Sequence, residues 1–436
     1  MSWPVRYKVV GLLMLSTVIN YADRVNISVA APDIMHQTGW GKAQFGFVLS
    51  AFLVGYTLFQ FPGGRIADRW SARKMLALSC FGFSLFTALT PLGQFGFVLL
   101  LILRFLVGAC ESISLPALAV FNAHWVPRQE FGRAQMVSIS GTSIGQMLAY
   151  PTTTWIIQMF SWPVVFYFNA VVGFLWMAVW LWYTTDAPRE HPQISAAELR
   201  HIESQAIPRA THHPLSFWSI ISTPSVLFLC LTYMLYAFIA WIFILWFPTY
   251  LVEARGFSRM AMGGVGMLPT FGSFLGMVVG GSISDWLLRR GFGARVARAR
   301  FPGVCVGLAM PLLLAAVLVP SATLSVALFV LFYFTFSLAV SGYWTMPIEL
   351  APRAVGAVGG VMNTAGNFAG IFGPTVAGFI VQQTGSWVTL FYLAAACGVI
   401  SSLIFTFFVS TDPIKIAGLE PGADGGKAEA RVGLGH

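Results

Sequence analysis

Long apolar runs alternate with short polar segments along almost the whole chain. Twelve of these runs are long enough to cross a bilayer, because a hydrocarbon core about 30 Å thick requires roughly 20 helical residues. Strands of a membrane β-barrel would be about ten residues long and would alternate in polarity, which these runs do not. The pattern predicts an all-α membrane protein with 12 transmembrane helices. The runs lie at residues 5–30, 44–64, 75–93, 97–117, 132–157, 163–184, 220–250, 261–284, 301–320, 323–348, 355–382 and 387–410.

One long polar interruption, residues 186–219, divides the chain. Six apolar runs precede it and six follow, which predicts two halves at residues 1–185 and 220–411. We interpret the interruption as a cytoplasmic linker with a short amphipathic helix. Residues 412–436 are rich in Gly and Ala with scattered charge, and we expect them to form a disordered cytoplasmic tail.

Two short patterns occur once in each half. The segment Gly64-Arg-Ile-Ala-Asp68 returns 217 residues later as Gly281-Ser-Ile-Ser-Asp285. The pattern Trp162-x3-Phe-Tyr-x5-Gly173 returns 225 residues later as Trp387-x3-Phe-Tyr-x5-Gly398. Repeats at nearly equal offsets indicate two pseudo-symmetric six-helix halves. This arrangement is typical of transporters whose substrate site lies between the repeats.

Composition narrows the class of protein further. Of the 436 residues, 57% are hydrophobic and only 9% are charged, whereas soluble domains contain about 25% charged residues. This excludes a soluble enzyme, a disordered protein and a fibrous protein. The five cysteines lie in apolar runs without metal-ligand spacing, and the linker histidines are irregularly spaced. We therefore expect no metal and no cofactor.

The positions of the basic residues predict the orientation in the membrane. If the N-terminus is cytoplasmic and the runs alternate in direction, 20 of the 25 Lys and Arg residues fall on the cytoplasmic side. The outer loops then hold only Lys42, Arg255 and Arg259. This asymmetry predicts that both termini are cytoplasmic. It also accounts for the net charge of +9 without a nucleic-acid partner.

Four charged residues stand out inside the predicted helices: Asp23, Arg24, Arg104 and Glu111. Each is unfavourable there, by about 2.5–3.5 kcal/mol for Arg or Asp at a helix centre on insertion scales. Arg104 and Glu111 are seven residues apart and share a helix face. A buried salt-bridge network that fixes helix packing is one interpretation. Apolar replacements of such networks are often neutral for stability, so packing alone explains the four residues poorly.

A binding role is the other interpretation of the four charges. Arginine stays protonated and can hold a substrate carboxylate in a low-dielectric cavity. Asp23 and Glu111 are then candidates for binding and releasing a proton. If an anion occupies Arg24, a neighbouring acid loses its counter-ion and binds a proton more readily. Two acids leave the number of protons per substrate open at one or two.

Neutral polar residues inside the runs are candidates for the rest of a binding cavity. Asn363 and Asn367 are four residues apart and share a helix face, although hydrogen bonding between helices is an alternative role for them. For the tyrosines the alternative is packing or anchoring at the membrane interface. The candidate residues are Tyr21, Tyr56, Gln146, Tyr233, Tyr236, Asn363 and Asn367.

A charged segment at residues 64–74 follows the second run. Its basic residues have a topological interpretation, since they keep the segment in the cytoplasm. Because its pattern is repeated at Asp285, we expect instead that Asp68, Arg69 and Arg73 form a gating latch with Asp285 between the two halves.

The segment Gly64-x3-Asp68-Arg69-x-Ser-Ala-Arg73-Lys74 resembles the signature of the major facilitator superfamily between helices 2 and 3, with Ser71 and Ala72 departing from its usual Gly and base. Further motifs resemble the anion:cation symporters of that superfamily, which include sugar-acid transporters. These motifs are Asn20-Tyr-Ala-Asp23-Arg24-Val-Asn26, Gln60-Phe-Pro-Gly-Gly64, Arg104-x6-Glu111, Gly281-x3-Asp285-x3-Arg289-Arg290-Gly291, and Asn363-x3-Asn367 with Gly373-Pro374.

The resemblance implies a monomer of 12 helices that works by rocker-switch alternating access. It implies that Asp23 and Glu111 couple protons and that Arg24 and Arg104 bind the anion. Sugar-acid members contact substrate at positions that match Tyr21, Tyr56, Gln146 and Asn367. The Gly-Pro pair of drug antiporters is absent from the segment at residues 141–146.

These features predict a proton-coupled importer of a small organic carboxylate in a cell membrane, a bacterial inner membrane by our expectation. Sugar acids such as hexonates, hexuronates or aldarates are the first candidates, and aromatic carboxylates are the second. A drug/proton antiporter is a third possibility, but two membrane arginines argue against a cation site. No HExxH motif supports an enzyme.

Overall fold

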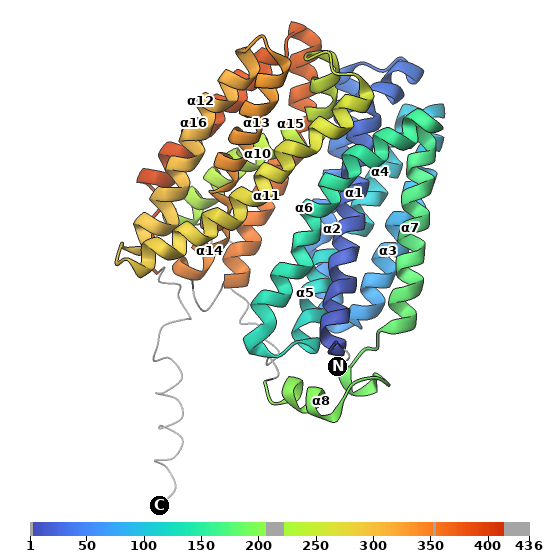
Figure 1. The fold of residues 1–436 in the computed structure, drawn as a ribbon, viewed down its shortest axis with the longest axis vertical. Helices are drawn as coiled ribbons and strands as arrows, with labels where there is room; N and C mark the ends of the chain where they lie inside the picture. The colour runs from blue at the N-terminus through green and yellow to red at the C-terminus, as the bar shows by residue number, and fades with distance from the viewer. Residues whose placement is uncertain (1–2, 206–221, 352–354, 414–436) are drawn as a thin grey trace, which may run out of the picture.

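The computed structural model describes residues 3–205, 222–351 and 355–413, except the side chains of residues 61, 63–69, 128, 356 and 357. All regular secondary structure in the described residues is helical, and Figure 1 shows two bundles side by side. The N-terminal bundle contains α1 (Val5–Thr38), α2 (Lys42–Arg69), α3 (Ala72–Leu89), η1 (Thr90–Phe95), α4 (Phe97–Glu111), α5 (Ser114–Trp125), α6 (Arg128–Met159) and α7 (Trp162–Tyr183). The C-terminal bundle contains α10 (Pro224–Glu253), α11 (Arg259–Arg289), η3 (Val296–Arg300), α12 (Phe301–Leu318), α13 (Ala322–Ser337), α14 (Val340–Leu350), α15 (Val355–Thr384) and α16 (Trp387–Phe407). The short elements η2 (Pro188–Glu190) and α8 (Ala196–Glu203) lie between the bundles in sequence.

The same helix pairs pack in both bundles. In the N-terminal bundle α1 packs on α6, α2 on α4 and α3 on α7. In the C-terminal bundle α10 packs on α15, α11 on α13 and α12 on α16. Counted in order along the chain, each pair in the N-terminal bundle corresponds to one pair in the C-terminal bundle. The bundles meet through α2 against α15 and α6 against α11, which are also equivalent pairs.

Helix ends follow local sequence signals. Ser71, Ser258 and Ser321 each accept a hydrogen bond from the backbone N–H three residues later and so cap α3, α11 and α13. Helix α1 extends to Thr38, beyond the predicted end at residue 30, and stops where Gly39 adopts φ +72°.

Two apolar runs predicted as single helices are each divided in two. The run at residues 97–117 breaks between α4 and α5, where the Ser112 hydroxyl donates to the Ala109 carbonyl. The run at residues 323–348 breaks between α13 and α14, near Leu338. Both break residues keep right-handed helical angles, so the chain bends without reversing.

Ten helical segments in the described part of the chain are long and apolar enough to cross a membrane. The helices α1 and α6 are not among the ten. Helix α1 carries Asp23 and Arg24 near its middle, and α6 is rich in Ser, Thr and Gln. These two polar helices pack on each other, and each also contacts the C-terminal bundle.

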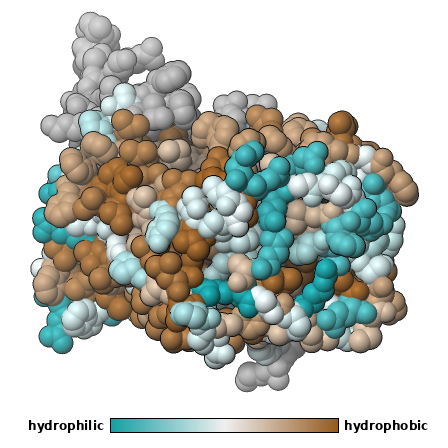
Figure 2. Space-filling view, turned by 90° about the horizontal axis from the view of Figure 1, so that it is seen from above, coloured by the Kyte–Doolittle hydropathy of each residue, from teal (hydrophilic) through white to brown (hydrophobic). Residues whose placement is uncertain are grey.

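The two ends of the molecule differ in how the bundles are connected. We call the end where α1 begins the near end and the opposite end the far end (Figure 1). At the far end, Arg259 of α11 pairs with Asp33 of α1, and Lys42 of α2 pairs with Glu253 of α10 at 3.2 Å. Hydrophilic side chains gather on the far-end face over the side of the N-terminal bundle (Figure 2).

At the near end, α8 is attached to the N-terminal bundle. The Glu198 carboxylate accepts from the backbone N–H groups of Val5 and Arg6 at 3.1 and 3.0 Å, which caps the start of α1. The Arg6 side chain also bonds Glu130 of α6 at 3.0 Å. This hydrogen bond from Arg6 holds the pKa of the Glu130 carboxyl below its usual value. Helix α8 is therefore fixed to the start of α1 directly and to α6 through Arg6.

Candidate functional site

The four charged residues predicted inside the membrane lie together in the N-terminal bundle. All are buried, with between 1% and 4% of each residue exposed. Close contact of α2 with α4 brings the two charges of α4 into position. At Gly108 an added Cβ would lie 2.0 Å from the Phe52 carbonyl oxygen, so only glycine permits this approach.

A direct ion pair joins α1 to α4. The Arg24 Nε donates to the Glu111 Oε1 at 2.6 Å. The rings of Tyr21 and Tyr56 lie against the same guanidinium, with centroids 4.4 and 4.5 Å from its Cζ. Because the pair is buried, its Coulomb interaction is much stronger than it would be in water, and the rings add cation–π attraction. Arg24 is therefore held in one orientation, with Glu111 as its counter-ion.

The other two charges retain unused hydrogen-bonding capacity. Arg104 has no hydrogen-bond partner at Nε or Nη1. It interacts electrostatically with Asp23 and Glu111. Asp23 accepts one bond, from the Thr87 hydroxyl at 2.9 Å, while its other oxygen is unpartnered. Unsatisfied groups of this kind are rare in protein interiors and are concentrated where a proton or ligand binds.

The Phe52 ring lies between the two arginines. Its centroid is 5.1 Å from the Cζ of Arg24 and 5.1 Å from that of Arg104. Its aromatic face attracts both cations and separates them. Nothing in the sequence distinguished Phe52 from other phenylalanines, and Thr87 was missed for the same reason, because Thr is common in apolar helices.

The neutral polar residues predicted to line the site differ in their partners: one bonds across the two bundles and another within its own helix. Asn367 of α15 donates to Gln60 of α2 at 2.9 Å and so joins the two bundles. Asn363 is half-buried one turn away on α15. Gln146 is half-buried and bonds the Thr142 carbonyl of its own helix at 3.4 Å. Gln60 belongs to a motif noted in the sequence, but its partner is 307 residues away and the sequence does not reveal the pairing.

Aromatic side chains gather in the C-terminal bundle around α10, the helix that packs against α1. Tyr233 of α10 contacts Tyr236, Tyr343 and Trp344, with ring centroids 6.3, 5.1 and 6.3 Å away. Helix α10, which carries Tyr233, packs against α1, which carries Tyr21. We call Tyr233, Tyr236, Tyr343 and Trp344 the aromatic layer.

The predicted gating latch does not bridge the bundles at its described residues. Arg73 donates to Thr184 at 3.3 Å and to the Leu181 carbonyl, both in its own bundle. Asp285 pairs with Arg298 at 2.8 Å, also in its own bundle. For Arg73 and Asp285 the expectation is therefore wrong in this conformation, because each has a nearer partner. The side chains of Asp68 and Arg69 lie outside the described ones.

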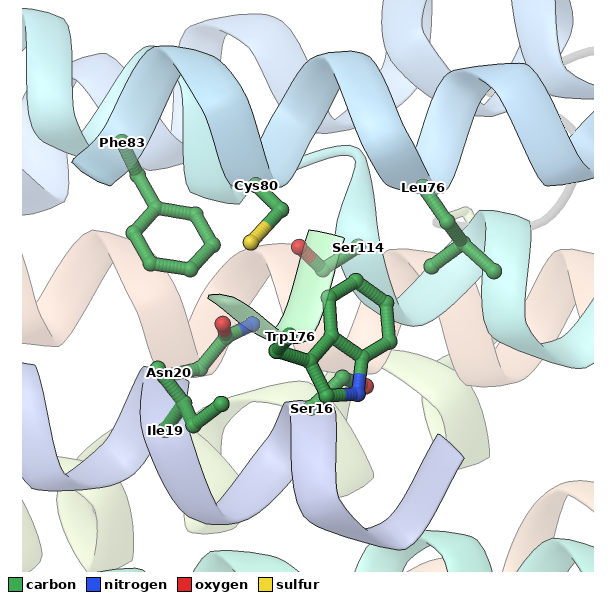
Figure 3. Close-up of a pocket in the computed structure, with 8 residues that line it drawn as sticks. All are labelled: Ser16, Ile19, Asn20, Leu76, Cys80, Phe83, Ser114 and Trp176. Atoms are coloured by element: carbon green, nitrogen blue, oxygen red, sulfur yellow. The ribbon is translucent and has the colours of Figure 1, made fainter. Parts of the chain in front are cut away.

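A narrow void lies inside the N-terminal bundle, and neither Arg24 nor Glu111 lines it. Figure 3 shows polar groups of Ser16, Asn20 and Ser114 around it, beside the ring of Trp176. The void is too narrow to admit a water molecule, so we interpret it as a packing gap. Over the described residues no group of three or more His, Cys, Asp or Glu side chains could hold a metal ion.

Comparison with known proteins extends these observations. The sequence model of the Major Facilitator Superfamily matches residues 13–374. A hexuronate transporter of Bacillus subtilis (strain 168) is 34% identical over 418 residues, which cover 94% of this chain and 96% of that protein. A probable galactarate/D-glucarate transporter of the same strain is 33% identical over 434 residues, which cover 94% of this chain and 93% of that protein.

Solved structures agree with this relationship at the level of the fold. A bacterial homologue of the human lysosomal transporter Spinster, in an inward-facing and unoccupied conformation, superposes with a TM-score of 0.73. It is 19% identical, and the superposition covers 93% of this chain and 98% of that one. The fold, the family match and the sequence relatives lead to one conclusion. The chain belongs to the Major Facilitator Superfamily.

Proposed function

We propose that the chain is a secondary active transporter that imports a small organic carboxylate together with protons. The buried Arg24–Glu111 pair is the observation that carries this proposal. A substrate carboxylate that binds Arg24 competes with Glu111 for the same guanidinium. Glu111 then loses its counter-ion in a low-dielectric site and takes up a proton. Substrate binding and proton binding at this pair therefore favour each other.

Asp23 is the second proton-coupling acid in this proposal, with Arg104 as its neighbouring base. If only Glu111 takes up a proton, a monoanion and a proton enter without net charge. If Asp23 also takes one up, each cycle moves one positive charge inward and gains about 2.3 kcal/mol per 100 mV of membrane potential. The electrical response of transport distinguishes the two stoichiometries.

We infer a topology of 12 membrane helices in two moving halves, residues 1–185 and 220–411, joined by the linker at 186–219. In this topology α4 with α5, and α13 with α14, each form one bent span, and both termini are cytoplasmic. The near end is then cytoplasmic, and the far-end ion pairs close the outer side. A monomer in a bacterial inner membrane suffices for rocker-switch alternating access.

Sugar acids are the substrate class that we propose. The sequence relatives are named for hexuronate and for galactarate/D-glucarate. The amide groups of Gln60 and Asn367 suit a hydroxylated substrate body, because each can donate and accept hydrogen bonds. The aromatic layer favours an aromatic carboxylate as the second candidate. A drug/proton antiporter is disfavoured, since Arg24 and Arg104 repel cations.

Uptake into proteoliposomes with an imposed pH gradient tests the proposal. We expect an inward proton gradient to drive accumulation of D-gluconate or D-glucuronate by the unaltered protein. We expect Glu111→Gln to abolish accumulation but to retain exchange of labelled for unlabelled substrate, because a neutral amide mimics the protonated acid. Glu203→Gln, at an exposed position in α8, is the matched control and should transport normally. Gradient-driven accumulation by Glu111→Gln at the normal rate would overturn the coupling role.

A further inference from the structure

The helices of the C-terminal bundle carry Asp, Glu, Lys and Arg only near their ends. Helix α10 has Glu253 as its last residue, and α11 has its charges at Arg259 and from Asp285 onward. Helix α14 has only Glu349, next to its end, and α12, α13, α15 and α16 have none. The central part of this bundle therefore offers no cation to a bound ligand.

Helix α1, which carries Arg24, packs against α10 of that uncharged half. Tyr21 and Tyr56 cover the guanidinium, and Tyr233 is a residue of α10. The Asn367–Gln60 hydrogen bond joins the bundles in the same pairing of α2 with α15. A substrate body that extends from Arg24 between the bundles thus meets hydroxyl, amide and aromatic groups.

The rings of the aromatic layer are held by contacts with their neighbours, which limits how far they can move to fit a ligand. The Tyr343 hydroxyl is engaged by Ser401 at 3.2 Å, and the ring of Tyr236 stacks on Phe336 with centroids 4.1 Å apart. An added Cβ at Gly366 would lie 2.5 Å from the Tyr233 ring, so this ring rests directly on α15. A charged group placed here cannot be accommodated by a simple rotation of one side chain.

Arg104 is the other arginine of the site, and its Nε and Nη1 have no hydrogen-bond partner. It is only 1% exposed and lies on the N-terminal side, against the Phe52 ring. Its charge is balanced by interaction with Asp23 and Glu111. A second carboxylate would have to leave the C-terminal bundle and enter the interior of the N-terminal bundle to reach it.

We propose that the site selects monocarboxylates with a neutral, hydroxylated body and rejects dicarboxylates built on the same carbon skeleton. This rests on the proposed function and deepens it. A second carboxylate would be buried beside Tyr233 and Asn367 without a cation, and burying an unpaired charge is strongly unfavourable. Hexonates and hexuronates are substrates, and aldarates are not.

D-Gluconate and D-glucarate form a matched pair of probes, because they differ only in the group at carbon 6. We expect purified protein to bind D-gluconate at least about 30-fold more tightly than D-glucarate in calorimetry at neutral pH, a ratio within reach of a site that leaves one charge unpaired. Equal or tighter binding of D-glucarate, with gradient-driven uptake intact, overturns the selectivity and leaves the proposed function standing. Uptake of neither compound overturns both.

A variant with an added cation tests the cause of the selectivity. We expect Asn367→Lys to raise the affinity for D-glucarate relative to D-gluconate at least about tenfold, since the second carboxylate gains a counter-ion. Gln383→Lys, at an exposed position near the end of the same helix, is the matched control and should leave the ratio unchanged. An equal shift in both variants would show that overall charge, and not the position of the cation, sets the ratio, which overturns the assignment.

Discussion

The two bundles share an architecture, but the interior of one holds charged side chains and the interior of the other holds aromatic ones. In the N-terminal bundle a buried ion pair, Arg24–Glu111, joins α1 to α4. In the C-terminal bundle α10 contributes tyrosines in place of the charges, and Tyr236 stacks on Phe336 of α13. Because the same helix pairs pack in both bundles, the fold itself does not require the charges. The difference indicates that helix packing is common to both halves, whereas a buried ion pair lies, among the described residues, in only one of them.

The two interiors also differ in what a substitution leaves behind. An aromatic pair contributes about 0.5–1.5 kcal/mol beyond its area burial, and its loss leaves a cavity. Loss of one member of a buried ion pair leaves an uncompensated charge, which is destabilising by about 3–5 kcal/mol. The largest effects are therefore expected in the N-terminal bundle.

Removing one member of the Arg24–Glu111 pair is the strongest test of this comparison. We expect Arg24→Leu to lower the free energy of unfolding by about 3–5 kcal/mol, because Glu111 is left unpaired. The double variant Arg24→Leu with Glu111→Leu should recover most of that stability while transport stays absent. Thermal unfolding in detergent and substrate uptake measure the two properties separately.

The double variant decides between the two roles of the pair. If Arg24 and Glu111 serve only to fix helix packing, the double variant should fold and retain transport. That outcome would contradict a binding role.

The membrane charges could be identified from sequence because their burial is costly and demands a reason. Their partners could not. Asp23 and Arg24 are adjacent, but Asp23 bonds Thr87 of α3 while Arg24 pairs with Glu111 of α4. Which side chain faces which helix depends on how α1 rotates against its neighbours, and this is set by tertiary packing.

The repeat of helices was visible in sequence, but the state of the gate was not. The motif around Asp285 predicted a charge interaction between the two halves, whereas in this conformation Asp285 pairs with an arginine of its own bundle. That arginine is Arg298, 13 residues away, and not a residue of the other bundle. A sequence pattern is common to every conformation of a transporter, whereas an ion pair belongs to one of them. The far-end pairs were missed because Asp33 and Glu253 lie outside any motif.

Disturbing the aromatic layer should have a smaller effect, on substrate affinity and not on folding. We expect Gly366→Ala to raise the KM for D-gluconate about tenfold, because the new methyl group forces the Tyr233 ring to shift. Gly360→Ala is the matched control on the same helix, since nothing lies within 4 Å of its added Cβ. Similar KM values for the two variants would remove Tyr233 from the site.

The smallest effect is expected where the two bundles meet at the far end. The Asp33–Arg259 pair is 22% and 37% exposed at its side chains, so it contributes only about 0.2–1 kcal/mol. Loss of this energy in Arg259→Gln should raise the population open at the far end by at most about fivefold, because the Lys42–Glu253 pair remains.

The readout is the rate at which a membrane-impermeant maleimide labels a cysteine at position 50, in a chain without its native cysteines. Ser50 is buried between the bundles beside Thr375, so its cysteine reacts only when they separate. Exchanging the two charges, with Asp33→Arg and Arg259→Asp together, should restore slow labelling. Fast labelling in the exchanged variant would mean that the bundles are held by packing of α2 on α15, and that the ionic chemistry of this protein lies in the N-terminal bundle alone.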